Sequence, residues 1–323
     1  MSGISAEARA AIDQFRQQRG QALDPLPAAD DVSGWAALQA FVESRMAPRV
    51  DDAIAAHHVD IVEASFDDMP ALRLRPAGLQ DNGGPDPAHA PAPLVFLHGG
   101  GYTTYSARSS LPASLPLAAA LGREVLSLDY TLAPTARVDE TVPAVTRALQ
   151  AILRKRGPFH LAGDSAGGGL AVAATLAMIS AGGPRPESVS LFSPWLDLAG
   201  TGDSRETMAA HDPMLRWTGM LDRCAAAYAG DDPAGPAASP LNTDFQAGFK
   251  AGFPATLIIC GTREILLSDS LRLHHRLRAA GHRSVLRVFD GLYHSFPVVT
   301  PGIPEADEAR AIVRDFIDRG AWS

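Results

Sequence analysis

Short apolar runs that alternate with helix-like segments dominate the sequence after residue 93. Most of the runs end in glycine or a polar residue. The runs are LVFLHG (94–99), EVLSLDY (124–130), FHLAGDS (159–165), SVSLFSPW (188–195), ATLIICGT (255–262) and SVLRVFDG (284–291). Continuous apolar runs of this length are typical of strands buried on both faces of a parallel sheet. Helix-like segments separate several of them, at 136–156, 166–181, 268–280 and 304–319. Alternating strands and helices predict an α/β doubly wound sheet.

The segment before this pattern is less regular. We expect helices over 5–18 and 33–56 and a β-hairpin from the runs at 58–65 and 71–77. The stretch 78–93 is rich in Pro, Gly and Asp, which predicts an exposed loop. The whole chain of 323 residues is long enough for one large α/β domain with a sizeable core.

The alternation lapses between residues 197 and 250, which leaves room for two or three short helices over the sheet. We expect one of them to begin in HDPML (211–215), with Asp212 as N-cap and Pro213 in the first helical position. Trp195 and Trp217 lie near this insertion. They either line a substrate pocket or pack within the core.

Charge and cysteine content exclude several classes of protein. A formal net charge of -8 gives no general attraction for nucleic acid or anionic membranes, so neither is expected as a partner. Cys224 and Cys260 lie far apart without a CxxC spacing, and they predict neither a disulfide framework nor a zinc site. The N-terminal stretch lacks the apolar core of a signal peptide, and no membrane span is expected. A soluble cytoplasmic protein is the expectation.

The stretch GDSAG at 163–167 matches the pattern G-x-S-x-G between an expected strand and an expected helix. In that context the pattern indicates a nucleophilic serine rather than a structural turn. A sharp strand-to-helix turn strains the serine backbone and crowds the residues two before and two after it, which favours glycine at both places. Ser165 is therefore the candidate nucleophile, and Ala166 offers an N–H at the helix start.

Three consecutive glycines follow His98 at the end of the first apolar run. A backbone without side chains approaches a ligand closely and directs N–H groups at it. Gly99 and Gly100 are the candidate donors to an oxyanion, with Ala166 as the third. We expect His98 to hold the loop by hydrogen bonds rather than to take part in catalysis.

A serine nucleophile needs a base and an orienting carboxylate, in the chain order Ser, Asp or Glu, His. Among ten histidines, His294 in FDGLYHSF follows the last expected strand and is the candidate base. Glu264 lies three residues past Gly261 and is favoured as the acid. Asp269 is the alternative but fits a helix start, and Asp290 is the weakest candidate.

Together these residues resemble a known family. HGGGY (98–102) and GDSAGG (163–168), with SPWLDL (193–198), DPML (212–215), ASPL (238–241) and GLYHSF (291–296), are similar to the hormone-sensitive-lipase family of α/β-hydrolases, with the bacterial carboxylesterases nearest. The resemblance implies an eight-stranded sheet flanked by helices and a Ser–acid–His triad. It also implies a helical cap, hydrolysis of short-acyl esters without metal or cofactor, and a homodimer.

The sequence departs from the family pattern at several positions. Glu264-Ile265-Leu266 stands where the family commonly has a D-P-L-like motif, so the acid is longer than usual. DYTLAPT (129–135) lacks an arginine and a glutamate that normally brace this loop. Tyr105-Ser106 replaces the frequent Gly-Ser, and the tyrosine either narrows the acyl pocket or faces solvent.

The resulting prediction is a serine carboxylesterase for short-to-medium acyl esters, with Ser165, Glu264 and His294 as triad. Its partner is a small-molecule ester, and no cofactor or metal is expected. We divide the chain into an N-terminal helical cap segment (1–56) and a catalytic domain (57–323) with a cap insertion at about 197–250. A lactonase or specific deacetylase with the same triad is the alternative, and a non-catalytic ligand receptor on this fold is a third possibility.

Overall fold

The structure, a computed structural model, describes residues 3–19, 26–79, 91–245 and 252–320. Within these residues eight strands form one sheet, in the order β1-β2-β4-β3-β5-β6-β7-β8. The strand bounds are β1 (Val59–Phe66), β2 (Met69–Pro76), β3 (Leu94–Leu97), β4 (Val125–Leu128), β5 (His160–Asp164), β6 (Ser188–Phe192), β7 (Ala255–Arg263) and β8 (Ser284–Tyr293). β2 pairs antiparallel with β1 and β4, and the other pairs are parallel. The predicted hairpin and the mostly parallel eight-stranded sheet are confirmed.

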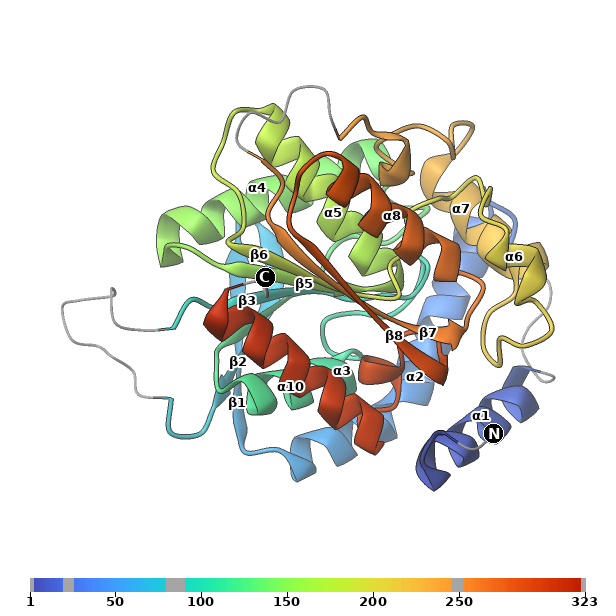
Figure 1. Cartoon of the computed structure of the whole chain (residues 1–323), viewed down its shortest axis with the longest axis horizontal. Coiled ribbons are helices and arrows are strands. Elements are labelled where there is room, and N and C mark those ends of the chain that lie inside the picture. Colours follow the sequence, from blue (N-terminus) through green and yellow to red (C-terminus); the bar gives the residue numbers. More distant parts are fainter. Residues whose placement is uncertain (1–2, 20–25, 80–90, 246–251, 321–323) are drawn as a thin grey trace.

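Helices cover both faces of this sheet, with α4, α5 and α8 on one face and α3 and α10 on the other (Figure 1). The longer helices are α1 (Ala6–Arg19), α2 (Val32–Ala56), α3 (Leu111–Leu121), α4 (Val138–Arg156), α5 (Ser165–Ser180), α8 (Leu267–Ala279) and α10 (Pro304–Arg319). The shorter ones are α6 (Ser204–Thr207), α7 (Asp222–Ala229) and α9 (Phe296–Val299). No helix in the described ranges is both long enough and apolar enough to cross a bilayer.

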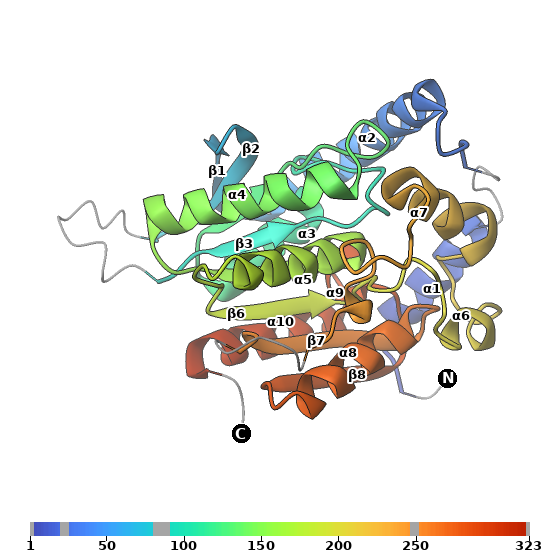
Figure 2. The same ribbon diagram turned by 90° about the horizontal axis from the view of Figure 1, so that it is seen from above.

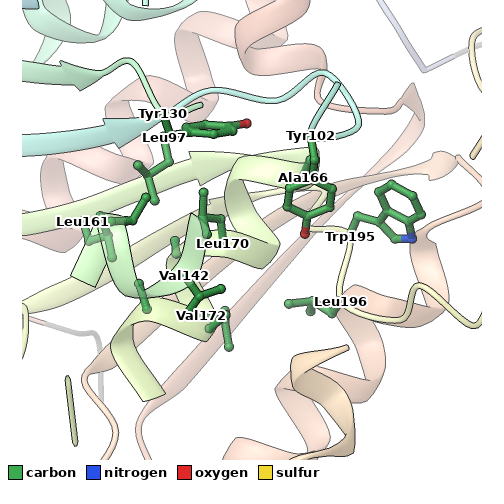
Figure 3. Close-up of a cluster of buried hydrophobic side chains, with 14 of the residues drawn as sticks. Leu97, Tyr102, Tyr130, Val142, Leu161, Ala166, Leu170, Val172, Trp195 and Leu196 are labelled. Carbon is green, nitrogen blue, oxygen red and sulfur yellow. The ribbon is translucent and has the colours of Figure 1, made fainter. Parts of the chain in front are cut away.

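The sheet separates two apolar cores. Along β3, Val95 and Leu97 join one core, while Leu94 and Phe96 join the other. This alternation follows from the period of two in a strand, and it explains why the sequence shows an unbroken apolar run. Figure 3 shows part of the first core, where side chains of β5 and α5 meet those of α4 and the neighbouring loops.

α5 is the central helix, and almost every residue of it is buried. Its sequence SAGGGLAVAATLAMIS is apolar or small on all sides, as expected of a helix enclosed by its neighbours. Small residues allow it to lie close to the sheet and the adjacent loops. Its first residue, Ser165, is thereby fixed at the carboxyl end of β5.

One long helix was missing from the sequence prediction. α3 contains Pro112 near its start and Pro116 inside it, and proline normally argues against a helix interior. Its buried leucines, including Leu111, Leu115 and Leu117, favour the helix nonetheless because they complete the second core. Tertiary packing here overrides local propensity.

The insertion carries the expected short helices, α6 and α7, but the prediction for HDPML was wrong. The Asp212 carboxylate accepts hydrogen bonds from the N–H groups of Met214 and Leu215, both at 2.8 Å, and closes a turn. Thr218 and Gly219 have non-helical dihedrals, so the next α-helix begins only at Asp222. Most of the exposed loop expected at 78–93 lies outside the described residues.

α1, α6 and α7 gather at the end of the molecule toward which the strand arrow of β6 points (Figure 2). The Arg19 guanidinium donates hydrogen bonds to the backbone carbonyls of Asp212 and Ala209. Leu26 N–H donates to the Gly219 carbonyl at 3.0 Å. The N-terminal segment and the insertion are therefore tied to each other at this end.

Candidate active site

Ser165 occupies a strained turn between β5 and α5. Its φ of 52° lies in the left-handed region, where a residue with a side chain is costly to hold. A Cβ on Gly163 would lie 2.3 Å from the Gly167 carbonyl oxygen, and a Cβ on Gly167 would lie 2.1 Å from the Leu97 carbonyl oxygen. Glycine is thus required on both sides of the serine by close approach of backbone, as the G-x-S-x-G pattern indicated.

The glycine loop after β3 lies beside this turn. Gly99 N–H donates to the Asp164 carboxylate at 2.8 Å. By contrast, the N–H groups of Gly100 and Gly101 bond to no acceptor among the residues that the structure describes. The N–H group of Gly99, a predicted oxyanion donor, is therefore already occupied in this geometry, whereas those of Gly100 and Gly101 are open.

His98 holds the loop in two ways. Its Nδ1 lies 2.9 Å from the Gly99 carbonyl oxygen, and its carbonyl accepts a hydrogen bond from the Tyr130 hydroxyl at 2.8 Å. The two rings stack with centroids 4.3 Å apart. Burial lowers the pKa of His98, which keeps the imidazole neutral near pH 7.

The structure brings together two of the expected residues directly. His294 follows β8, Glu264 follows β7, and Nδ1 of His294 lies 3.0 Å from Oε2 of Glu264. Both side chains are almost completely buried. The other carboxylate oxygen of Glu264 accepts hydrogen bonds from Gly261 N–H at 2.8 Å and from the Ser193 hydroxyl at 2.9 Å.

Asp269 and Asp290, the two alternative candidates for the acid, have hydrogen-bond partners other than His294. The Asp269 carboxylate accepts hydrogen bonds from the N–H groups of Leu196 and Asp197, at 2.7 and 3.0 Å. Asp290 is exposed and accepts a hydrogen bond from the Thr262 hydroxyl. Neither has a hydrogen bond to His294 in the described structure, whereas Glu264 has one.

Negative charge surrounds the imidazole of His294. Burial alone would lower the pKa of His294, but the hydrogen bond and charge of Glu264 outweigh it, with smaller contributions from Asp212 and Asp164. The net effect raises its pKa above the usual value. The site therefore favours an imidazolium, which is the state that a general base reaches after it takes a proton.

Ser165 shares the carboxyl edge of the sheet with this pair but is not hydrogen-bonded to it. Its hydroxyl makes no hydrogen bond to any described residue, and Nε2 of His294 has a long contact of 3.4 Å with the Ser295 hydroxyl. Catalytic hydrogen bonds often tighten only when substrate is bound. Among the described residues, no group of His, Cys, Asp or Glu is arranged to hold a metal ion.

Comparison with known proteins identifies the family. Residues 94–298 match the family described as alpha/beta hydrolase fold. An acetyl-hydrolase of Streptomyces hygroscopicus is 36% identical over 228 residues, which cover 69% of this chain and 74% of that protein. The crystal structure of an esterase from the bacterial hormone-sensitive lipase family is 30% identical, with a TM-score of 0.80 and 98% of both chains covered. The chain belongs to the hormone-sensitive-lipase family of α/β-hydrolases. It is an ester hydrolase.

A second relative matches a larger share of this α/β-hydrolase. An esterase of Acinetobacter venetianus is 30% identical over 259 residues, which cover 78% of this chain and 84% of that protein. The similarity therefore includes most of the chain and is not confined to the serine motif.

The insertion of this hydrolase contacts the glycine loop directly. A Cβ on Gly101 would lie 2.8 Å from Sγ of Cys224 in α7, and the rings of Tyr102 and Tyr228 stack with centroids 3.8 Å apart. The ring centroids of Tyr102 and Trp195 lie 5.7 Å apart, and Figure 3 shows these two rings near Ala166. Trp195 is fully buried, so it packs in the core rather than lining an open pocket.

Three polar residues lie at the site although the sequence analysis did not place them there. Asp164 orients the Gly99 peptide, and burial raises its pKa to about 6 despite the opposing charge of His294. Asp212 accepts a hydrogen bond at 2.9 Å from the N–H of Ile265, the residue after Glu264. The Ser193 hydroxyl donates a hydrogen bond to Glu264 itself. Each lies in a motif that carried the family resemblance, but only the fold brings them to the site.

Proposed function

We propose that this α/β-hydrolase is a serine carboxylesterase with Ser165 as nucleophile, His294 as base and Glu264 as the orienting acid. The single observation that carries the proposal is the buried hydrogen bond of 3.0 Å between His294 and Glu264, at the same sheet edge as the strained Ser165 turn. A nucleophile, a base and a group that fixes the base are the parts that acyl transfer needs.

The proposed reaction has two halves. Ser165 Oγ attacks the ester carbonyl while Nε2 of His294 takes the hydroxyl proton. His294 then returns the proton to the leaving alcohol, and an acyl-enzyme remains. Water repeats the sequence at the acyl carbon and releases the acid, while Glu264 keeps Nδ1 protonated and stabilises the imidazolium.

We assign the oxyanion donors to Gly100, Gly101 and Ala166. The first two have N–H groups without a described acceptor, and Ala166 lies at the N-terminus of α5, where helix N–H groups and the helix dipole favour negative charge. Removal of one such donor typically lowers kcat by about a hundredfold or more.

The proposed substrates are short-to-medium acyl esters of small molecules. Tyr105 is half-buried, with a positive φ, and its ring packs against Gly100, where a Cβ would lie 2.6 Å from its Cδ2. A bulky ring beside the oxyanion donors supports a limit on acyl size. We further propose that residues 1–56 and the insertion at about 197–250 form a cap over the site, which the Arg19 contacts support.

The proposal is tested with p-nitrophenyl acetate, butyrate and octanoate on the wild type and on Ser165→Ala. We expect turnover by the wild type, fastest with the shorter chains, and loss of turnover in the variant. Labelling of Ser165 by a fluorophosphonate, read by mass spectrometry, checks the nucleophile independently. A folded wild type that turns over none of these esters would refute the carboxylesterase proposal and direct the search to lactones.

A further inference from the structure

We propose that Ser193 is a positioning residue that ties the catalytic acid to the loop of the catalytic base. This role is an addition to the proposed function and rests on the assignment of Glu264 and His294 given above. Ser193 begins the motif SPWLDL at the carboxyl end of β6. The triad assignment gives this motif no chemical role, and the proposed link supplies one.

The Ser193 hydroxyl has one hydrogen bond in each direction. It accepts a hydrogen bond from Ser295 N–H at 2.9 Å, and its own proton goes to Oε1 of Glu264 at 2.9 Å. A hydroxyl has a single proton, so the bond from Ser295 leaves that proton for the carboxylate. Because Ser295 follows His294 directly, one oxygen atom joins the acid loop to the base loop.

The backbone at both ends of this link is strained. Ser193 has a φ of 45° and Ser295 a φ of 49°, both in the left-handed region that non-glycine residues rarely adopt. Both side chains are completely buried. Glycine would fit these dihedrals at lower cost, so the presence of serine points to a need for the hydroxyl rather than for the turn alone.

The consequence for catalysis is control of the Glu264 carboxylate. Oε1 is held by Ser193 and Gly261, which leaves Oε2 aimed at Nδ1 of His294. Without the hydroxyl, Glu264 keeps one backbone donor and can rotate, and the base loop loses its anchor at Ser295. We expect a lower kcat with little change in KM, because the Ser193 side chain is completely buried and its hydroxyl is occupied by Glu264 and Ser295.

The test compares four variants. Ser193→Ala and Ser193→Gly both remove the hydroxyl, but glycine suits the positive φ, so it separates chemistry from backbone strain. Ser193→Thr restores a hydroxyl. Ser190→Ala is the matched control, because Ser190 is a buried serine of β6, close to Ser193 in the chain, and its hydroxyl has no partner among the described residues.

We expect Ser193→Ala and Ser193→Gly to lower kcat for p-nitrophenyl butyrate by roughly tenfold to a hundredfold, the range for a hydrogen bond to a charged group. Loss of the Ser193 donor leaves more negative charge on the Glu264 carboxylate, which stabilises the imidazolium of His294 and raises the pKa of His294. The acid limb of the kcat/KM profile should therefore move to higher pH. Ser193→Thr should recover part of kcat, and Ser190→Ala should match the wild type.

A folded Ser193→Gly with wild-type kcat and pH profile would overturn the inference, as would an equal loss in Ser190→Ala. Nuclear magnetic resonance of the His294 ring nitrogens provides a readout without turnover. A changed Nδ1–H signal and titration in Ser193→Gly would support the inference even if the wild type hydrolysed no ester. An unchanged signal and titration would refute it whether or not the esterase proposal held.

Discussion

Glu264 and Asp269 are both buried acidic side chains, on the loop and the helix after β7, and their partners distinguish them. Glu264 is bonded to the imidazole of His294, whereas Asp269 holds two backbone N–H groups of the segment after β6. Glu264 is thus placed to orient the proposed base, whereas Asp269 stabilises the backbone after β6.

This difference predicts a large loss of activity from one substitution and almost none from the other. Glu264→Gln places an amide opposite Nδ1 and removes the charge that stabilises the imidazolium, so kcat should fall by about a thousandfold or more. Asp269→Asn keeps an oxygen that accepts both N–H groups and should keep kcat within about threefold, the range of a small change in one hydrogen bond. Steady-state kinetics on both variants checks this, and an inactive but folded Asp269→Asn would reverse the assignment of the acid.

Asp269 should instead affect stability as a function of pH. Burial, the largest effect, raises its pKa to about 8 from an unfolded value near 3.8. The folded state then holds the proton over this interval and the unfolded state does not, so this group lowers the free energy of unfolding as pH rises from about 4 to about 8. Asp269→Asn should flatten that part of the curve, as measured by urea unfolding at several pH values. A parallel decline in both proteins would contradict the prediction.

At the scale of residues, the sequence predicted those positions that a local pattern defines. Ser165 and its flanking glycines follow from the steric needs of one turn. The sequence did not reveal that the Gly99 N–H is occupied by Asp164, 65 residues away in the chain, which argues against Gly99 as a donor. That pairing depends on β3 lying beside β5, which no local pattern records.

At the scale of elements, strands and amphipathic helices were predictable and packing exceptions were not. The hairpin of β1 and β2 and the strands of the parallel sheet lie where the apolar runs indicated. α3 was missed because its prolines oppose a helix until the second core stabilises it. HDPML resembles a helix start, yet its acidic side chain is used for a turn and for Ile265.

The contact between α1 and the insertion gives an element-scale prediction. Arg19→Ala removes the guanidinium that binds the carbonyls of Asp212 and Ala209. We expect KM for p-nitrophenyl butyrate to rise by about two- to tenfold, the worth of an ordinary hydrogen bond, with a smaller change in kcat.

The matched control is Arg16→Ala, because Arg16 lies on the same helix and pairs only loosely with the exposed Asp13 at 3.7 Å. It should leave KM unchanged. Limited proteolysis should also cleave near α1 sooner in Arg19→Ala than in Arg16→Ala. Identical behaviour of the two variants would show that α1 is held by other contacts.

At the scale of the whole molecule, the sheet ends in two edges, β1 and β8. An unpaired edge strand readily pairs with another chain, and a two-fold dimer is the commonest closed arrangement. We expect a homodimer through β8, where Val288 is 41% exposed. Val288→Lys should convert it to a species near the chain mass of 34.0 kDa in size-exclusion chromatography with light scattering.

The opposite edge supplies the control for that experiment. Val62 on β1 is 44% exposed, so Val62→Lys introduces the same charge at a comparable site. It should leave the dimer intact. A wild type that elutes as a monomer, or a Val62→Lys variant that dissociates while Val288→Lys does not, would refute dimerisation through β8.

The junction between the insertion and the acid loop limits how this protein can be recombined with its relatives. Asp212 binds Ile265 N–H, while the Ser204 hydroxyl donates to the Ile265 carbonyl and the Ser268 hydroxyl donates to Asp203. A chimera that receives a foreign insertion without these polar groups would leave a buried N–H and C=O unsatisfied directly beside the acid. We therefore expect that a crossover placed between the insertion and the loop after β7 disturbs the position of Glu264, and that the two segments have to be exchanged together.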